Sequence, residues 1–218
     1  MNRLVRILIG IPIVVGLTDY FIVLAGGGPD FLSRPIGAAY LILWSVWLLV
    51  TALGRPPGRP SSLDRQMRIL VPLSVVVVPV MVAGPPWEYV HFDGPIPRDG
   101  SLAWVGIGIF AGSIILEAAA LWSLHGLYTA WLGIQPEHRL VTSGPYRLVR
   151  HPGYLSNLLS LVGIGLALGS LIALTLALLI VPLILPRMKT EEQMLMDEFG
   201  EEYQAYMRRT RRLVPFVY

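Results

Sequence analysis

The chain has 218 residues, of which 54% are hydrophobic and only 14% are charged, and its formal net charge is +3. Soluble globular domains carry about 25% charged residues, so this composition excludes that class and indicates a membrane protein. The chain contains no cysteine, which excludes disulfides and thiolate metal sites, and the spacing of its four histidines predicts no metal centre. The basic residues are not interleaved with aromatic ones, so a nucleic-acid surface is not expected.

Apolar runs of membrane-spanning character recur along the chain. A spanning helix needs about 20 mostly apolar residues. Runs of this kind occupy residues 4–25, 36–53, 69–83, 102–124 and 154–185. The last run is too long for one span, and its interruption at Gly169 and Ser170 predicts a helical hairpin. The sequence therefore predicts an all-α, polytopic integral membrane protein with about five to six membrane segments.

Basic residues indicate how the chain is oriented in the membrane. Under this topology only Arg34 and Arg98 fall on one side, whereas the other arginines and the lysine fall on the opposite side. We therefore expect both termini to be cytoplasmic, with a basic rim that attracts anionic lipid by about 1 kcal/mol per residue. The excess of arginine over lysine favours a bacterial inner membrane.

Two further patterns predict local structure. The proline- and glycine-rich stretch 84–100 is expected to be a loop, with Trp87 and Tyr89 at the membrane interface. Apolar residues at three- and four-residue spacing within 187–212 predict one amphipathic helix. Those residues are Leu195, Phe199, Tyr203 and Tyr206.

Two similar glycine patterns lie inside membrane segments and predict close helix packing rather than nucleotide binding. They are Gly106-Ile107-Gly108 with Gly112, and Gly163-Ile164-Gly165 with Gly169.

The polar residues concentrate in two stretches, 135–151 and 187–212, which the hairpin should bring together. Proline and glycine within HRLVTSGPYRLVRHPGY (138–154) predict a shaped loop that offers backbone groups to a polar cofactor. For Arg147 or Arg150 taken singly, an anchor to lipid headgroups is an equally good interpretation.

Three acidic residues are associated with the apolar segments. Glu191 and Glu192 follow the last one directly, with Arg187 one helical turn before Glu191, and we expect Glu191 to face a pocket. Glu117 lies in an otherwise apolar run. A functional role and a position facing a water-filled cavity explain this carboxylate equally well.

LVTSGPYRLVRHPGY (140–154) and RMKTEEQMLMDEFGEEYQAY (187–206), followed by Leu213, Val214 and Pro215, resemble the isoprenylcysteine carboxyl methyltransferase family and its bacterial relatives. The resemblance covers 126–218, whereas 1–125 matches only as generic membrane helices. It implies one structural domain in two parts, with four N-terminal segments on the substrate side and a catalytic region at 126–218. Ser156 and Asn157 stand where the family usually has a small residue such as glycine.

The resemblance implies methyl transfer from S-adenosylmethionine, leaving S-adenosylhomocysteine, in a pocket open to the cytoplasm. The acceptor is a lipophilic molecule that enters from the bilayer. The resemblance implies catalytic roles for Arg187, Glu191 and His151. It also implies that Arg187 lies on the substrate side, and we add Glu117 as a second candidate for binding the substrate. Cofactor contacts are implied for His138, Arg139, Leu140, Val141, Tyr146, His151, Pro152, Gly153, Tyr154 and Glu191.

The sequence leaves the acceptor open. The carboxylate of an isoprenylcysteine is already ionised and needs no general base, and Arg187 would orient it. A phospholipid amine needs a base, for which His151, Glu191 or water is available. A sterol-reductase-like enzyme that uses NADPH resembles the same region, and a lipid-binding or transport protein would explain the helices but not the paired polar stretches.

Overall fold

A computed structural model of the chain describes residues 10–54, 65–98, 100–124 and 140–213, with the side chains of 65–76 left aside. The described residues form helices, and the one bridge of β type among them is isolated. The helices are α2 (Ile11–Ala25), α3 (Pro29–Ser33), α4 (Pro35–Gly54), α5 (Arg65–His91), α6 (Ser101–Ser123), η2 (Gly144–Arg147), α7 (Pro152–Leu168), α8 (Leu171–Phe199) and α9 (Glu201–Arg209). The predicted all-α fold is confirmed.

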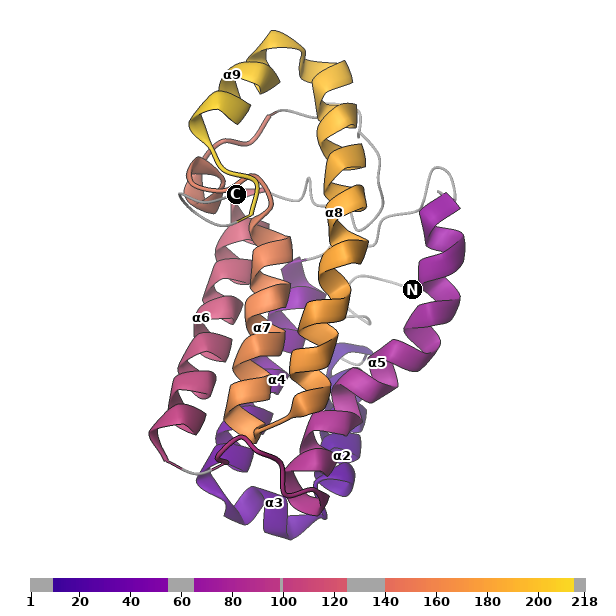
Figure 1. The fold of residues 1–218 in the computed structure, drawn as a ribbon, viewed down its shortest axis with the longest axis vertical. Helices are drawn as coiled ribbons and strands as arrows, with labels where there is room; N and C mark the ends of the chain where they lie inside the picture. Colours follow the sequence, from indigo (N-terminus) through magenta and orange to yellow (C-terminus); the bar gives the residue numbers. More distant parts are fainter. Residues whose placement is uncertain (1–9, 55–64, 99, 125–139, 214–218) are drawn as a thin grey trace.

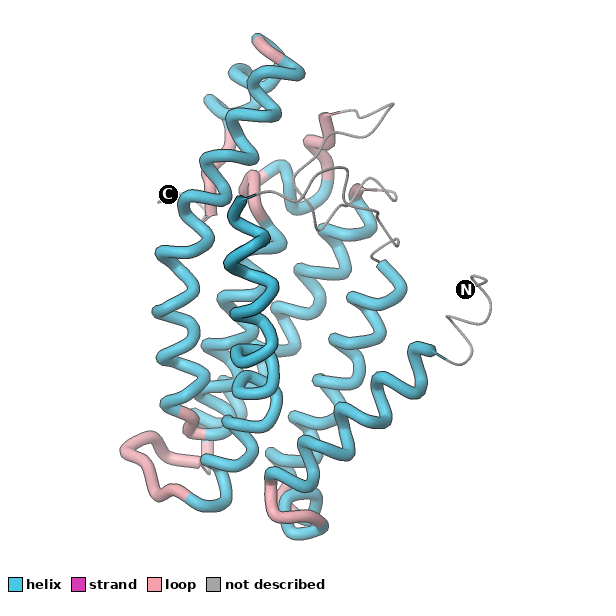
Figure 2. Tube along the Cα trace, turned by 90° about the vertical axis from the view of Figure 1, so that its right-hand side faces the viewer, coloured by secondary structure: helices cyan, strands magenta, loops and turns pink. Residues whose placement is uncertain are grey.

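The long helices form an elongated bundle in which α6 packs along α7, α4 covers α6, and α8 lies against α7 (Figure 1). Figure 2 shows the described connecting segments at the two ends of this bundle. A buried apolar core runs between the helices and includes Tyr40, Phe110, Ile164 and Leu168.

Three of the described helices, α4, α6 and α8, are long and apolar enough to cross a membrane, and α2 and α7 are shorter apolar helices. This supports a polytopic membrane protein. The count of five to six spans and the cytoplasmic placement of both termini stay predictions.

The predicted hairpin is present between α7 and α8. Gly169 has a φ of 61°, a left-handed conformation that glycine adopts without steric cost, and it ends α7. Ser170 then caps α8, since its hydroxyl accepts from the backbone N–H of Ala173 at 3.1 Å. The apolar part of α8 ends at Leu185, and its charged last turns extend beyond the ends of α6 and α7 (Figure 1).

The prediction of a loop over 84–100 is wrong for its first half, because α5 continues through Pro85 and Pro86 to His91. Both prolines are fully buried. Membrane bundles tolerate proline within helices, because neighbouring groups can satisfy the backbone groups that it frees. Trp87 is exposed, but Tyr89 is completely buried rather than at an interface.

The predicted single amphipathic helix is interrupted at Gly200, whose φ of 52° ends α8 and turns the chain into α9. Leu195 and Phe199 are therefore half-buried on α8, whereas Tyr203 and Tyr206 are buried on α9.

Close packing through glycine is confirmed where α6 crosses α7. A Cβ on Gly106 would lie 2.3 Å from the backbone nitrogen of Ala167, and one on Gly163 would lie 2.6 Å from that of Phe110. Gly112, by contrast, faces open space. Only part of each glycine pattern therefore serves the helix crossing.

Candidate functional site

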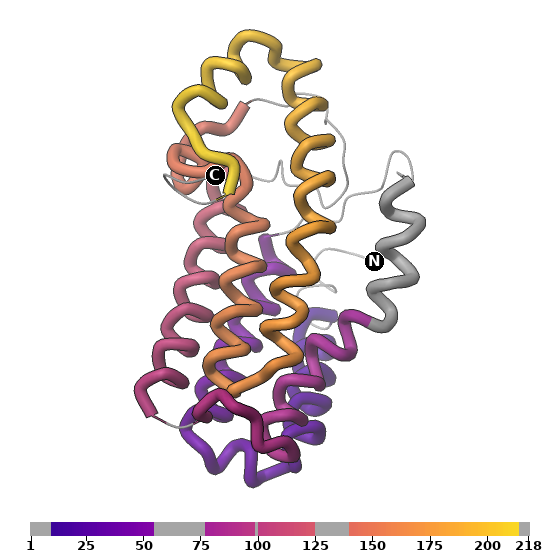
Figure 3. Tube along the Cα trace, viewed as in Figure 1, coloured from indigo at the N-terminus to yellow at the C-terminus, as the bar shows by residue number. Residues whose placement is uncertain are grey.

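The described parts of the two polar stretches, 140–151 and 187–212, meet at the end of the bundle opposite the hairpin turn. The loop that leads into α7, the charged end of α8, and α9 gather there (Figure 3). The hairpin causes this, because α7 leaves that end and α8 returns to it.

Arg187, Tyr154 and Glu191 form a chain of hydrogen bonds at this end. Arg187 donates from Nε to the Tyr154 hydroxyl at 2.8 Å, and that hydroxyl donates to Oε2 of Glu191 at 3.3 Å. Arg187 and Glu191 lie four residues apart on one face of α8, and Tyr154 lies in the first turn of α7. The structure thus brings together three residues predicted for the site.

His151 lies beside this chain, immediately before α7. Its side chain is buried, and its backbone N–H donates to the carbonyl of Arg212 at 3.1 Å. One ring nitrogen, Nδ1, is 3.8 Å from Oε2 of Glu191, and the other, Nε2, is 3.3 Å from Oε1 of Glu192. His151 therefore stands between two carboxylates.

Glu192 is a buried carboxylate of the site, although the sequence favoured its neighbour Glu191 as the pocket residue. Its Oε1 accepts from Nε of Arg150 at 2.7 Å, and its Oε2 accepts from Arg212. Burial alone would raise the pKa of Glu192, but hydrogen bonds from His151, Arg212 and Arg150 hold that pKa well below its ordinary value. The carboxylate is therefore ionised.

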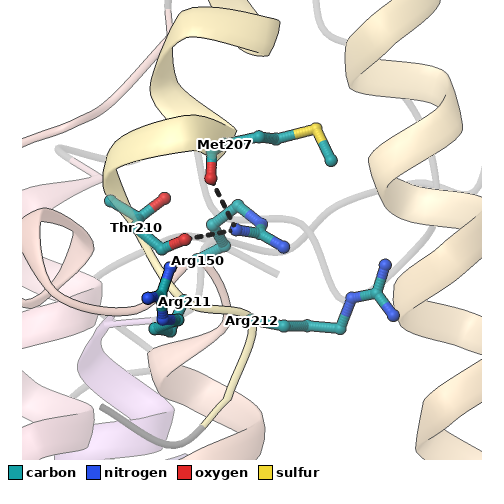
Figure 4. Close-up of a pocket in the computed structure, with 5 residues that line it drawn as sticks. All are labelled: Arg150, Met207, Thr210, Arg211 and Arg212. Carbon is teal, nitrogen blue, oxygen red and sulfur yellow. Dashed lines mark hydrogen bonds between the residues drawn. The ribbon is translucent and has the colours of Figure 1, made fainter. Parts of the chain in front are cut away.

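The chain that follows α9 completes the site by pairing with the loop before α7. Val149 and Arg211 form a parallel bridge, with Arg150 N–H donating to the Arg211 carbonyl at 2.8 Å. The Arg150 guanidinium also donates to the carbonyl of Thr210 at 2.7 Å (Figure 4). These contacts fix the backbone that carries His151.

Tyr206 on α9 adds a further tie to the loop. Its hydroxyl donates to the carbonyl of Tyr146 at 2.7 Å. Burial raises the pKa of Tyr206 to about 12, so the phenol remains a donor near neutral pH. This hydrogen bond thus holds the backbone of Tyr146 against α9.

An open hollow lies beside the ion pairs, on the side of α9 (Figure 4). Its lining residues are Arg150, Met207, Thr210, Arg211 and Arg212. None of them belongs to the set predicted to contact a cofactor, so this hollow does not locate that pocket.

Glu117 is fully buried on α6 and accepts from the Ser156 hydroxyl at 2.5 Å. Its carboxylate lies against Gly153 in the first turn of α7, next to the residues described above. Ser156, where the family usually has a smaller residue, therefore serves as a hydrogen-bond partner for this acid.

The remaining predicted cofactor residues are less informative. His138 and Arg139 lie outside the described residues. Leu140 and Val141 are half-buried in the loop, and Pro152 is buried as the first residue of α7. Their roles stay predictions.

A second carboxylate that the sequence did not reveal lies at the opposite end of the bundle. Glu88, which is 5% exposed, accepts from the Ser170 hydroxyl at 2.5 Å and from the N–H groups of Leu171 and Ile172 at 3.1 and 3.0 Å. It caps α8 across the hairpin turn, which makes its role structural.

Comparison with known proteins places these residues in a family context. The model of the isoprenylcysteine carboxyl methyltransferase family matches residues 104–197. Protein-S-isoprenylcysteine O-methyltransferase B of Arabidopsis thaliana is 34% identical over 133 residues, covering 60% of this chain and 67% of that protein. The cobalt-zinc-cadmium resistance protein CzcN of Cupriavidus metallidurans is 29% identical over 169 residues, covering 73% and 72%.

A solved structure shares the fold. The structure of the eukaryotic intramembrane Ras methyltransferase, an isoprenylcysteine carboxyl methyltransferase, superposes with a TM-score of 0.59 at 18% identity, covering 94% of this chain and 74% of that one. At this identity the likeness concerns the arrangement of helices.

Proposed function

Because the chain belongs to the isoprenylcysteine carboxyl methyltransferase family of membrane enzymes, we propose that it transfers a methyl group from S-adenosylmethionine to a lipophilic acceptor arriving through the bilayer. The first candidate acceptor is the carboxylate of an isoprenylcysteine, the group that gives the Arabidopsis relative its name. The observation that carries the proposal is the continuous contact of Arg187, Tyr154, Glu191 and His151 at one end of the hairpin.

The residues present suit the cofactor. When bound, S-adenosylmethionine supplies an activated methyl group and also presents an amino group and a carboxylate. The Glu191 side chain is 38% exposed, so its carboxylate is accessible to an amino group, which it would hold by a charge-assisted hydrogen bond. Backbone N–H groups of the loop 140–154 would hold the carboxylate end.

Arg187 is suited to the acceptor. Its Nε donates to the Tyr154 hydroxyl, which holds the planar guanidinium in a fixed direction. A carboxylate acceptor is ionised near neutral pH and needs orientation rather than proton removal. Positioning of this kind supplies a large share of the rate of a two-substrate reaction.

The first test is calorimetric binding of S-adenosylmethionine and S-adenosylhomocysteine to the protein in detergent. We expect the intact protein to bind both, and Glu191→Ala to weaken binding at least about tenfold, which corresponds to 1.4 kcal/mol. Glu198→Ala is the matched control, because Glu198 is exposed one to two turns further along α8 and has no part in the site. Binding of NADPH in place of S-adenosylmethionine would instead identify a reductase.

A second experiment identifies the acceptor. Transfer of labelled methyl groups is measured with an S-prenylated cysteine, an isoprenoid acid, a phospholipid amine and a lipophilic thiol in separate reactions. If the carboxylate acceptors alone are methylated, Arg187→Gln should raise the acceptor KM more than that of the cofactor. Methylation of the amine alone would show that the site removes a proton, with His151 or Glu191 as base.

A further inference from the structure

We propose that Glu192 is a positioning residue that fixes the tautomer of His151, with the proton on Nε2 and the lone pair of Nδ1 turned toward Glu191. This inference rests on the proposed function, because it assigns that lone pair a role in holding the amino end of the cofactor. It concerns a residue that makes no direct contact with substrate.

The proton's place follows from the partners of Glu192. Two guanidinium groups, of Arg150 and Arg212, donate to this buried carboxylate, which is therefore ionised. An ionised carboxylate can only accept hydrogen bonds. Its 3.3 Å contact with His151 thus requires a proton on Nε2 of the imidazole.

The direction of the ring follows from its backbone and its neighbours. The His151 N–H is bonded to the carbonyl of Arg212, and Arg150, the preceding residue, is bonded to Glu192 and to Thr210. Both the backbone of His151 and the Nε2 side of its imidazole are therefore fixed. A hydrogen bond to one ring nitrogen determines which nitrogen remains unprotonated in the neutral ring.

The Nδ1 side of the ring suits one particular kind of ligand. Nδ1 of His151 lies 3.8 Å from Oε2 of Glu191, which is too long for a hydrogen bond between them. A lone pair and a carboxylate at this separation can both accept from one donor-rich group. A primary ammonium, such as the amino group of an amino acid, can donate to both of them.

This arrangement resembles the way a buried carboxylate orients a catalytic histidine in hydrolases, where exchanging the acid for its amide gives the wrong tautomer. Arg150 and His151 share Oε1 of Glu192, whereas Arg212 donates to Oε2. In Glu192→Gln the amide oxygen would stay with Arg212, the closest of the three donors, and the NH₂ would face His151 and Arg150. That NH₂ is a donor, so Nε2 would become the acceptor and the proton would move to Nδ1. The Nδ1 side of the ring would then present a donor to the ammonium and repel it.

The first arm of the experiment reads the tautomer directly. The protein is labelled with ¹⁵N-histidine, and the His151 ring signals are assigned by their loss in His151→Gln. We expect Nε2 protonation in the intact protein and in Glu198→Gln, and a shift of the proton to Nδ1 in Glu192→Gln. An unchanged tautomer in Glu192→Gln overturns the proposal, and this arm requires no cofactor.

The second arm measures affinity for S-adenosylmethionine in a double-mutant cycle. We expect Glu192→Gln to weaken binding about tenfold or more in the intact background, but less than about twofold when His151→Gln is already present. Equal losses in both backgrounds would show a general structural role and overturn the proposal. If the intact protein fails to bind the cofactor, the proposed function fails, while the tautomer arm still decides the role of Glu192.

Discussion

Buried carboxylates in this protein are held by different kinds of donor, and the donor indicates the role. Glu88 accepts from a serine and two backbone N–H groups, Glu117 accepts from Ser156, and Glu192 accepts from arginines and a histidine. Backbone donors stabilise a helix end, whereas cationic side chains on different segments join those segments together. An unpaired carboxylate at any of these positions would be strongly unfavourable.

Replacing Glu88 tests the cap of α8. Glu88→Ala leaves the Ser170 hydroxyl and the first N–H groups of α8 without their partner, so we expect a loss of about 1–3 kcal/mol in the free energy of unfolding. The measurement is chemical or thermal unfolding in detergent. Asp30→Ala, which removes an exposed acid near the same end, should change stability by less than about 0.5 kcal/mol. Equal effects of the two substitutions would contradict the capping role.

Acid titration tests Glu192. Its pKa is depressed in the folded protein below the ordinary value of 4.5, so the unfolded chain binds the proton more readily. The stability that it contributes is therefore full above pH about 4.5 and is lost progressively as the pH falls below that value. We expect the unfolding temperature in detergent to fall over this range. Glu192→Gln should lower stability at neutral pH and flatten the acid limb, and an unaltered acid limb would contradict this account.

At the scale of helices, the crossing of α6 and α7 places Glu117 against the first turn of α7. The crossing depends on Gly106 and Gly163, where backbones approach too closely for a side chain. Small residues allow such approach in membrane helices. The site is thus built on a helix pair with little freedom to adjust.

Gly163→Ala tests this crossing. The new methyl group would meet the backbone of Phe110 at 2.6 Å, so the helices must separate, and we expect a loss of about 1–3 kcal/mol in stability. Gly112→Ala is the matched control, because it faces open space on α6 and should be neutral or slightly stabilising. The two variants are compared by thermal unfolding in the same detergent. A neutral Gly163→Ala would contradict the close packing.

At the scale of the whole molecule, the two parts of the chain predicted from the sequence are joined by packing. The helix α6 belongs to the first part, 1–125, and α7 belongs to the second, yet they pack along one another and share the Glu117–Ser156 hydrogen bond. We expect 126–218 expressed alone to bind no cofactor, and co-expression with 1–125 to restore binding. Calorimetry on the co-purified pair checks this. Binding by 126–218 alone would show that the second part is an independent unit.

The sequence predicted the features that depend on composition and on strong turn signals. The hairpin at Gly169 and Ser170 is an example, because an apolar run of double length must turn somewhere. Proline and glycine led to a wrong prediction where tertiary packing determines the local structure. The helix α5, for example, continues through Pro85 and Pro86. In a membrane bundle, neighbouring helices replace the contacts that a proline removes.

Part of the predicted set of site residues lies together in the structure, whereas the roles of these residues stay predictions. Arg187, Glu191, His151 and Tyr154 could be predicted as neighbours because they occur in two recognisable stretches that the hairpin joins. The sequence favoured Glu191 as the inward-facing residue, whereas the structure buries Glu192. Adjacent residues differ by about 100° around a helix, and only the packed bundle decides which one faces inward. Glu88 gave no signal, because its partners follow some 80 residues later.

The parallel bridge between Val149 and Arg211 has a consequence for the synthesis of the protein. About 60 residues separate the bridged segments, so at 5–20 residues per second the loop with His151 is made roughly 3–12 s before its partner. During that interval the membrane hairpin can insert, whereas the backbone pairing that holds His151 must wait for Arg211 and Arg212. Insertion of the hairpin therefore precedes completion of the polar end. Arg211→Pro, which removes the N–H that donates to the Leu148 carbonyl at 3.1 Å, should therefore reach the membrane in normal amounts but bind S-adenosylmethionine more weakly, as membrane yield and calorimetry would show.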